Sequence, residues 1–354
     1  MKICFFIYNI SNPGGSERVT TIIANELKNR GYDVSILSIC GKDSFYKLNE
    51  NIPINIIYKN KFDINSKTKF FSILKKAYKY HKDNKTDVII DVFASRSLIS
   101  IPIKALLNIK NISWEHFNYS VKEGLNPIAR KVACLFSDKI ITLTNEDIQL
   151  YKNNNKVIKS EMDYIYNPSP FLNAEISKLH EKNVVTVGRL TYQKGYDILL
   201  DAWQLIEKST DWKLTLVGDG EEKENLIEKA KRLKLKNINF LGVTDNIAEV
   251  YKNSSIFVSS SRFEGLPMCM IEAQSFGLPI VSFNCLTGPS EIIENNGSGY
   301  LVENGDYYEL AEKILDLINN KEKMFEFGKK AKEDSKRFTI DSIIVKWEMI
   351  INNL

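Results

Sequence analysis

The sequence predicts an α/β protein made of two doubly wound domains, each a parallel β-sheet with helices on both faces. Short apolar runs alternate with segments of helical periodicity along the 354 residues, which is the pattern of repeated strand–helix–strand units. The runs are apolar almost throughout, as expected of strands buried on both faces of a sheet. The length also fits two domains of roughly 150 to 200 residues.

The first half of the chain accounts for one doubly wound sheet. We expect strands at 2–8, 34–40, 54–58, 87–92, 110–115 and 139–144, and helices at 16–30, 67–83, 97–107 and 125–136. Pro168 and Pro170 then remove backbone donors and restrict the chain, which is typical of a linker. We therefore place the domain boundary between residues 167 and 168.

The second half repeats the alternation from residue 184 onward. We expect strands at 184–189, 213–217, 238–241, 255–259, 279–283 and 300–302, and helices at 195–207, 221–234, 246–252, 269–276, 306–318, 321–334 and 340–353. The last helix has an apolar face but no strand left in its own domain to cover it.

The charge is unevenly distributed along the chain. Residues 1–167 carry 25 basic and 16 acidic side chains, whereas residues 168–354 carry 23 and 28. The excess of positive charge in the first half suggests an anionic partner, such as a membrane surface, a phosphorylated acceptor or nucleic acid. Nucleic acid is the least favoured, because no zinc-ligand spacing, ribonucleoprotein motif or helix-turn-helix signature accompanies the charge.

Residues 59–85 concentrate this charge, with nine lysines against two aspartates. Phe70, Phe71, Leu74 and Tyr78 are expected on one face of a helix. The face either packs on the sheet while the lysines are solvated, or the helix lies on an anionic membrane leaflet. The membrane contacts would then come from Lys67, Lys69, Lys75 and Lys76.

Cysteine usage and hydropathy bear on the compartment. The five cysteines are widely spaced without a C-x-x-C pair, which indicates small core residues in a reducing environment. The longest uncharged stretch, 273–290, is interrupted by glycines and prolines, and the first apolar run is expected to be a strand, not a signal peptide. We expect a cytoplasmic protein that is peripheral on the inner face of the membrane, with no metal site, because no Asp-x-Asp pair or His/Cys cluster occurs.

Two glycine-bearing loops at strand ends suggest anion binding. Gly14 and Gly15 precede a helix, whose free N–H groups attract anions, although an ordinary tight turn has the same composition. Their pattern is not G-x-G-x-x-G, so a dehydrogenase is not favoured. In the second half, Arg189 and Lys194 follow a strand and either converge on a diphosphate or are solvated.

Two glutamates, Glu264 and Glu272, follow the expected strand at 255–259. Glu272 lies in an apolar helix and needs a partner there, either ribose hydroxyls or a structural ion pair. Glu264 precedes a Gly-Leu-Pro turn and either contacts sugar hydroxyls or caps the helix.

The sequence 14–18 (GGSER), Gly188-Arg189-Leu190 followed by Lys194-Gly195, the run 217–220 (VGDG), and the seven residues between Glu264 and Glu272 occur together. This combination resembles retaining glycosyltransferases of family 4. The resemblance implies a GT-B fold, in which two Rossmann-like domains face a cleft. The helix at 340–354 would then cross back to an acceptor-side domain of residues 1–167, leaving residues 168–339 as the nucleotide-sugar domain.

The resemblance also implies roles for individual residues. Arg189 and Lys194 would hold the donor diphosphate, Glu272 the ribose, and Glu264 would lie beside the transferred sugar. His116 matches a histidine near the far hydroxyl of that sugar, and it is counted with Glu264, Arg189 and Lys194 as catalytic. Further donor contacts would come from Gly14, Gly15, Val243, Gly265 and Leu266.

The implied reaction moves a hexose or N-acetylhexosamine from a nucleotide sugar, with UDP expected, to a hydroxyl of a lipid-linked or polysaccharide acceptor. No cofactor or metal is expected. The segment 282–293 resembles bacterial members that build lipid-linked oligosaccharides, capsule or lipopolysaccharide. A nucleotide-sugar epimerase of the same fold and a non-catalytic GT-B partner subunit remain as alternatives.

Overall fold

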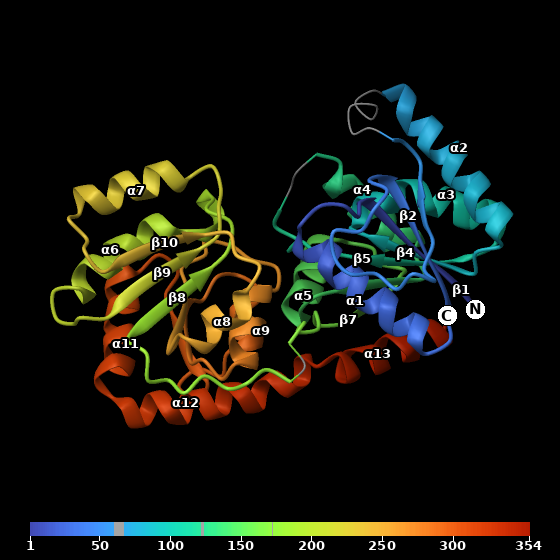
Figure 1. Cartoon of the computed structure of the whole chain (residues 1–354). Coiled ribbons are helices and arrows are strands. Elements are labelled where there is room, and N and C mark those ends of the chain that lie inside the picture. Colours follow the sequence, from blue (N-terminus) through green and yellow to red (C-terminus); the bar gives the residue numbers. More distant parts are fainter. Residues whose placement is uncertain (60–66, 122–123, 172) are drawn as a thin grey trace. The chain divides into compact units, whose positions relative to one another are not determined.

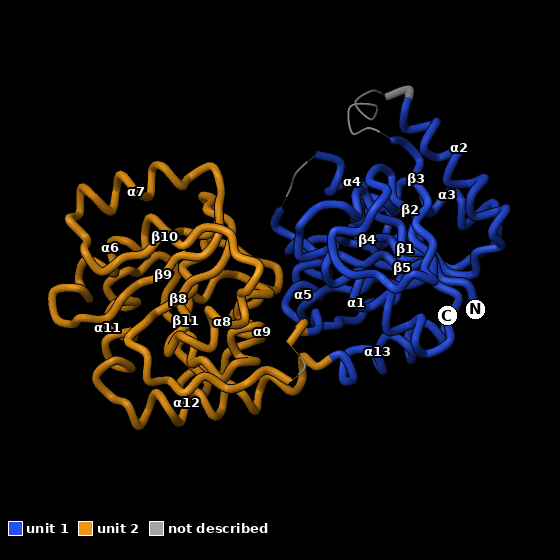
Figure 2. Tube along the Cα trace, viewed as in Figure 1, with its two compact units in different colours: residues 1–168, 340–354 blue, residues 169–339 orange. Residues whose placement is uncertain are grey.

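A computed structural model describes residues 1–59, 67–121, 124–171 and 173–354. The chain divides into two compact units, one of Met1–Pro168 with Ile340–Leu354 and the other of Ser169–Thr339 (Figure 2). The division falls one residue after the boundary expected from the prolines. Each unit has its own sheet and core.

Unit 1 contains a seven-stranded parallel sheet in the order β3-β2-β1-β4-β5-β6-β7. Its strands are β1 (Lys2–Asn9), β2 (Asp33–Cys40), β3 (Ile54–Ile56), β4 (Val88–Val92), β5 (Lys110–Trp114), β6 (Lys139–Thr142) and β7 (Glu161–Tyr164). The helices are α1 (Gly15–Asn29), α2 (Lys67–Asn84), the short η2 (Ala94–Arg96), α3 (Ser97–Leu107), α4 (Asn126–Phe136) and α5 (Asn145–Asn154). The central strands are buried along almost their whole length.

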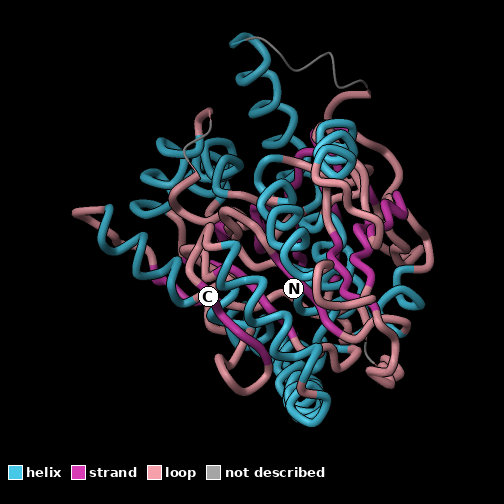
Figure 3. Tube along the Cα trace, turned by 90° about the vertical axis from the view of Figure 1, so that its left-hand side faces the viewer, coloured by secondary structure: helices cyan, strands magenta, loops and turns pink. Residues whose placement is uncertain are grey.

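Unit 2 contains a six-stranded parallel sheet in the order β10-β9-β8-β11-β12-β13. Its strands are β8 (Asn183–Val187), β9 (Lys213–Val217), β10 (Ile238–Gly242), β11 (Ile256–Ser259), β12 (Ile280–Phe283) and β13 (Gly299–Val302). The helices are η3 (Tyr192–Lys194), α6 (Tyr196–Ile206), α7 (Lys223–Arg232), α8 (Ile247–Lys252), α9 (Met268–Ser275), α10 (Pro289–Ile292), α11 (Tyr307–Asn319), α12 (Lys321–Asp334) and η4 (Ser335–Phe338). Helices flank the strands throughout (Figures 1 and 3).

The expected α/β fold class is confirmed, and most expected elements are found within two residues of their predicted ends. Sequence analysis missed α5, the edge strand β7 and the short α10. Their sequences explain this, because α5 is rich in asparagine and β7 (EMDY) is mostly polar. Both lie toward the edge of the sheet, where one-sided burial leaves a weak apolar pattern.

The C-terminal helix α13 (Ile340–Asn352) belongs to unit 1. Its buried face includes Trp347, whose ring lies 4.9 Å from that of Trp114 on β5. On the rim, Arg30 Nη1 and Glu348 Oε2 form an ion pair at 2.8 Å. The apolar face of α13 therefore packs in unit 1, and not in unit 2, which precedes it in sequence.

The predicted apolar face of α2 is wrong in one residue. Phe70, Leu74 and Tyr78 pack against the core of unit 1, whereas Phe71 is 71% exposed. A spacing of four residues keeps side chains on one stripe of a helix, and Phe71 belongs to the neighbouring stripe, with exposed Lys75.

No described helix is long and apolar enough to cross a membrane. All five cysteines are free, and all except Cys269 are fully buried. The cysteines therefore pack as small core side chains, as their apolar surroundings in the sequence predict.

Candidate active site

In unit 2, the loop after β8 is held against the loop after the neighbouring β9. The Gly188 amide donates to the Val217 carbonyl at 2.9 Å, and the Leu190 amide donates to the Asp219 carbonyl at 3.0 Å. A Cβ atom on Gly218 would lie 2.0 Å from the Gly188 carbonyl oxygen. The two backbones approach this closely only because a glycine stands there, which fixes the loop that carries Arg189.

The loop after β8 continues into η3, where Lys194 meets Glu264 from the loop after β11. Lys194 Nζ lies 2.7 Å from Glu264 Oε1, and these side chains are 18% and 7% exposed. Ser261 Oγ donates to the same carboxylate oxygen at 2.6 Å. Gly195 has φ +62°, and a Cβ there would lie 2.0 Å from the Ser260 carbonyl oxygen. The strand order places β8 and β11 side by side, so residues 70 positions apart become an ion pair.

The protonation states of this pair follow from its surroundings. Burial by itself lowers the pKa of Lys194, but the adjacent Glu264 carboxylate outweighs burial and raises the pKa above its usual value. The ammonium is therefore charged at any physiological pH. Of its three N–H donors, one is used by Glu264, which leaves positive charge and hydrogen-bonding capacity at the carboxyl edge of the sheet.

Glu272, on α9, is 5% exposed and accepts a hydrogen bond from Tyr251 Oη at 3.0 Å. Tyr251 was not expected at this site from the sequence, because it lies 21 residues away on α8 and no motif marks it. For Glu264, the alternative to a sugar contact was a helix cap, but the structure shows an ion pair with Lys194.

The Cys269 thiol lies near all three of these charged groups. Its pKa is raised to about 12, mainly by burial; the Lys194 ammonium lowers it, and the Glu264 and Glu272 carboxylates raise it. The three side chains therefore share one region of unit 2. The carboxyl ends of β8 and β11, where the strand order reverses, are the general ligand-binding position of an open α/β sheet.

The remaining unit 2 residues of the predicted site lie on loops at the same edge. The Arg189 side chain is exposed, and it makes no hydrogen bond or ion pair with any residue that the structure describes. Val243, just after β10, is 76% exposed. Leu266 is buried, and Thr287 Oγ1 donates to the Glu264 carbonyl at 2.6 Å, which holds the turn containing Gly265.

In unit 1, Gly14 and Gly15 lie at the start of α1, after β1. A Cβ on Gly14 would lie 2.2 Å from Glu17 Oε2, and Ser16 Oγ donates to that oxygen at 2.8 Å. Glycine thus leaves room for the Glu17 carboxylate to fold back toward the helix N-terminus, where the helix dipole favours negative charge. Sequence analysis assigned no role to Glu17.

His116 follows β5 in the same unit. Its ring lies 4.2 Å from that of Trp114 and 5.1 Å from that of Phe93, and Nε2 is buried without a hydrogen-bond partner among the described residues. Burial lowers the pKa of His116 to about 3, so the imidazole is neutral at physiological pH. A neutral imidazole with a free nitrogen can form a hydrogen bond with a hydroxyl, and it suits a hydroxyl better than a charged group.

A buried ion pair, also missed by sequence analysis, anchors the loop after His116. Arg130 Nε lies 2.8 Å from Glu115 Oε2, with both side chains at most 2% exposed. The Arg130 guanidinium also donates to the carbonyl oxygens of Asn118, Tyr119 and Val121. Glu115 Oε1 in turn accepts from the amide of His116 at 3.1 Å, so the pair fixes the backbone that carries the histidine.

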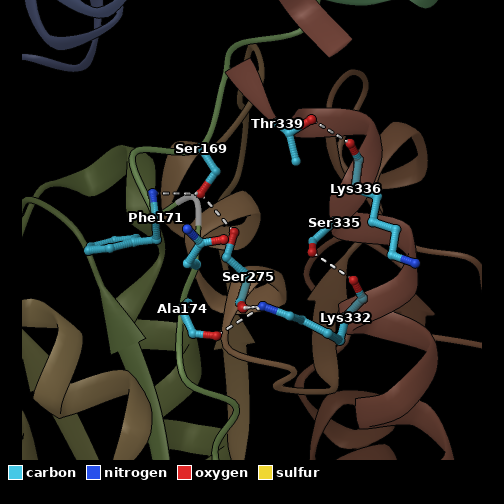
Figure 4. Close-up of a pocket in the computed structure, with 9 residues that line it drawn as sticks. Ser169, Phe171, Ala174, Ser275, Lys332, Ser335, Lys336 and Thr339 are labelled. Carbon is cyan, nitrogen blue, oxygen red and sulfur yellow. Dashed lines mark hydrogen bonds between the residues drawn. The ribbon is translucent and has the colours of Figure 1, made fainter. Parts of the chain in front are cut away.

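A cavity of about 390 Å³ in unit 2 is lined by other residues, which come from 169–171, 173–174, Ser275 and 332–339 (Figure 4). Lys332 Nζ donates there to the carbonyl oxygens of Ala174 at 3.1 Å and Ser275 at 2.6 Å. Lys332 therefore connects the segment around Ala174, near the start of unit 2, to the end of α9. Within the described ranges, no group of three or more His, Cys, Asp or Glu side chains gathers as metal ligands.

Comparison with known proteins identifies the family. Residues 13–169 match the family model "Glycosyltransferase Family 4", and residues 172–334 match "Glycosyl transferases group 1". A protein of Haemophilus influenzae named as a glycosyltransferase is 38% identical over 99% of both chains. This chain belongs to the family 4 glycosyltransferases.

Two further relatives of this glycosyltransferase carry more specific names. An amylovoran biosynthesis glycosyltransferase of Erwinia amylovora is 30% identical over 99% of both chains. An α-1,4-N-acetyl-D-galactosaminyltransferase of Campylobacter jejuni, named for an undecaprenol-diphosphate-linked acceptor, is 30% identical over 99% of this chain and 98% of its own.

Solved structures share the fold of the glycosyltransferase. HepE of Anabaena, crystallised with UDP, superposes with a TM-score of 0.85 at 20% identity over the whole of both chains. The lipopolysaccharide outer core galactosyltransferase WaaB superposes with a TM-score of 0.80 at 19% identity, again over both whole chains. The expected GT-B fold, with two Rossmann-like parallel-sheet domains, is confirmed.

Proposed function

We propose that this glycosyltransferase moves a hexose or N-acetylhexosamine, with retention of anomeric configuration, from a UDP-sugar to a hydroxyl of a membrane-associated glycan in bacterial surface polysaccharide synthesis. The observation that carries the proposal is the Lys194–Glu264 ion pair with Glu272 close by, at the carboxyl edge of the unit 2 sheet. This edge is where an open α/β sheet binds a nucleotide.

The donor roles follow from the charges of these groups. Lys194 has N–H donors left after Glu264, and Arg189 is exposed without a partner in the described chain, so both suit the oxygens of a diphosphate. Glu272 is a buried carboxylate on α9, and carboxylate oxygens suit the hydroxyls of a ribose. Glu264 and neutral His116 suit hydroxyls of the transferred sugar.

In the proposed reaction, the acceptor hydroxyl oxygen forms a bond to the anomeric carbon on the face from which the diphosphate leaves. The bond between that carbon and the diphosphate oxygen breaks, and the acceptor proton passes to the departing phosphate oxygen. Negative charge grows on the diphosphate as the bond breaks. Lys194 and Arg189 stabilise that charge more in the transition state than in the ground state, which is what accelerates a reaction.

The acceptor side is supported by relatives and by α2. The Campylobacter jejuni relative is named for a lipid-linked acceptor and the Erwinia amylovora relative for an exopolysaccharide. On α2, Lys75 and Lys76 are exposed near Phe71, which suits a helix that rests on an anionic leaflet. Lys76 Nζ also donates to the Ile57 carbonyl at 3.2 Å, so it serves a local contact as well. The side chain of Lys67 lies outside the described residues.

A single assay tests the proposal against an epimerase and a non-catalytic subunit. The protein is incubated with a panel of nucleotide sugars, with and without bacterial lipid extract, and free nucleoside diphosphate and isomerised donor are measured. A transferase releases UDP in proportion to glycosylated lipid. An isomerised donor without release indicates an epimerase, and no turnover of any donor indicates a non-catalytic subunit. The anomeric configuration of the product, read by NMR, tests retention.

Metal independence is tested separately. We expect activity to persist in excess chelator, since cationic side chains are proposed to neutralise the diphosphate. Activity that disappears with chelator and returns with manganese would show that a metal takes part.

A further inference from the structure

The sheet of unit 1 has its own topological switch point, between β1 and β4. The chain runs from β1 outward to β2 and β3, and from β4 outward in the opposite direction to β5, β6 and β7. The loops after β1 and β4 therefore lead in opposite directions, and the carboxyl ends of the strands at such a switch point are the general ligand-binding position of open α/β sheets. Tyr8, near the end of β1, and Arg96, at the end of η2 after β4, flank this position.

Arg96 supplies a cation at this position. Its guanidinium carbon is 5.4 Å from the centroid of the Tyr8 ring, and its Nε is buried without a hydrogen-bond partner. Across the described part of the chain, the guanidinium makes no hydrogen bond and no ion pair. The buried Asp91 carboxylate interacts with the Arg96 charge without a direct ion pair, and its Oδ2 accepts hydrogen bonds from Ser97, Ser100 and Asn111.

The contrast with Arg130 shows that this arrangement is unusual for unit 1. Arg130 is buried with a carboxylate and three carbonyl oxygens as partners, which is how a structural arginine is compensated. Arg96 has the Tyr8 ring face and the more distant charge of Asp91, but no hydrogen-bond acceptor among the described residues. A buried donor without a partner is costly unless something else supplies the acceptor.

Aromatic side chains border the same position. Phe93, which immediately precedes η2, has φ +79°, a strained conformation for a bulky residue. Its ring lies 5.1 Å from that of His116 and 4.9 Å from that of Phe117, and Phe117 is 43% exposed. Apolar ring faces beside a cation suit a ligand with a carbohydrate ring and a negative charge.

We propose that Arg96 is an acceptor-binding residue that takes an oxyanion, either a phosphate or a carboxylate, carried by the acceptor glycan. The guanidinium fork matches both groups bidentately, and the donor diphosphate already has Lys194 and Arg189 in unit 2. This inference rests on the proposed function and adds the chemical class of the acceptor. It also gives the positive charge of unit 1 a specific use.

Binding of small anionic sugars to the full chain tests the proposal. N-acetylglucosamine 1-phosphate and glucuronic acid are titrated by saturation-transfer NMR, each beside its neutral twin, N-acetylglucosamine or glucose. Saturating UDP fills the donor site during these titrations. We expect at least one anion to bind about 10-fold or more tightly than its twin, and Arg96→Gln to remove that preference. The anion that binds distinguishes a phosphate acceptor from a uronic acid acceptor.

Two variants serve as controls. Lys152→Gln removes an exposed charge of unit 1 and should leave the preference for anions unchanged. Arg96→Lys keeps the charge but loses the fork, and it should retain part of the preference. Thermal unfolding of Arg96→Gln shows whether the variant is folded; if it is not, the comparison of Arg96→Lys with the wild type decides.

The outcomes separate this inference from the proposed function. UDP should bind wild type and Arg96→Gln alike, and that titration tests the donor site by itself. Arg96 would be assigned to the donor site, against our proposal, if Arg96→Gln weakened UDP and the anion in parallel. Equal binding of anions and neutral twins by the wild type, or an unchanged preference in Arg96→Gln, would also overturn it.

Discussion

Lys194 shows how one side chain can be both structural and functional. Its ammonium is paired with Glu264, which offsets part of the cost of burying both charges. The same ammonium has donors left for phosphate oxygens. A charge held in place before the substrate arrives needs no reorganisation during the reaction, and this preorganisation is the main source of electrostatic catalysis.

Replacing Lys194 or Arg189 by alanine should therefore remove most transfer. We expect about a 10²-fold or greater loss of kcat, the usual effect of deleting one donor to a developing oxyanion. UDP release from the wild type and the two variants measures it. Lys182→Ala, which breaks an exposed ion pair with Asp211 in the same unit, is the matched control and should keep full activity.

Lys194→Ala and Arg189→Ala should differ in their effect on the free energy of unfolding. Lys194→Ala leaves Glu264 buried without its cation, so the free energy of unfolding should fall by up to about 3–5 kcal/mol, and Glu264→Gln in the same chain should recover part of it. Arg189→Ala removes an exposed, unpaired side chain and should change stability by less than about 0.5 kcal/mol. Wild-type turnover in either single variant would refute the diphosphate role.

Asp147, behind the His116 loop, predicts a pH dependence of stability. It accepts the Tyr119 amide at 2.9 Å, and burial raises its pKa from 3.8 to about 7. The folded state therefore holds this proton more tightly than the unfolded state does. Its contribution to stability is fully present below pH 4 and is lost as the pH rises toward 7, with a slope of at most about 1.4 kcal/mol per pH unit.

Asp147→Asn keeps the hydrogen-bond acceptor but removes the titration. Compared with the wild type, the variant should be more stable at pH 8 and no more stable at pH 4, as measured by thermal unfolding across that range. Asp83→Asn, at an exposed position of α2, should follow the wild-type curve. Parallel curves for Asp147→Asn and wild type would mean that this carboxyl does not carry the effect.

At the scale of elements, α13 is a helix whose partner lies far away in sequence. Trp347 is fully buried against Trp114, and the Trp114 ring also supports His116. The contacts of Trp114 therefore connect α13 to the loop that carries His116, a proposed site residue. Closing the chain back onto unit 1 makes that unit discontinuous in sequence.

Trp347→Ala should destabilise unit 1 by about 3–5 kcal/mol, because it removes a large buried side chain from the face of α13 and leaves a cavity there. Denaturant unfolding followed by circular dichroism measures the loss. Met349→Ala, on the exposed side of the same helix at 60% exposure, should stay within about 0.5 kcal/mol of the wild type. Equal effects of the two substitutions would contradict the packing.

At the scale of the whole molecule, the two units differ in net charge, and this difference bears on binding to anionic surfaces. Residues 340–354 carry one basic and two acidic side chains, so unit 1 with α13 has a net charge of +8 and unit 2 a net charge of −4. Charge of one sign on one unit favours association of that unit with an anionic surface and adds long-range attraction.

We expect unit 1 to bring the protein to anionic liposomes. Binding in a sedimentation assay should rise with anionic lipid and collapse in high salt, since the Debye length falls from about 10 Å at 0.1 M to about 3 Å at 1 M. Changing Lys67, Lys69, Lys75 and Lys76 to Glu should abolish it. The matched control changes Lys208, Lys231, Lys234 and Lys236 of unit 2 to Glu, and an equal loss there would show that only net charge matters.

The fold and most of the donor motifs could be predicted from the sequence. Strands buried on both faces are apolar throughout, and the glycines at their ends mark loops with close backbone approach, as at Gly218 against Gly188. Such signals are local, since a few adjacent residues carry them. The positions of Arg189, Lys194, Glu264 and Glu272 left alternatives open by themselves, and the roles expected of them came from the resemblance of their motifs to family 4 glycosyltransferases.

Only the tertiary structure decided which side chains contact one another. Tertiary packing brings Glu264 to Lys194, Tyr251 to Glu272, Arg130 to Glu115 and Trp347 to Trp114. It leaves Arg96 beside Tyr8 with no hydrogen-bond acceptor in the described part of the chain. The sequence by itself determined which residues form strands, helices and turns, because those depend on neighbours in the chain. It did not determine which buried charges are compensated, because that depends on which strands lie side by side.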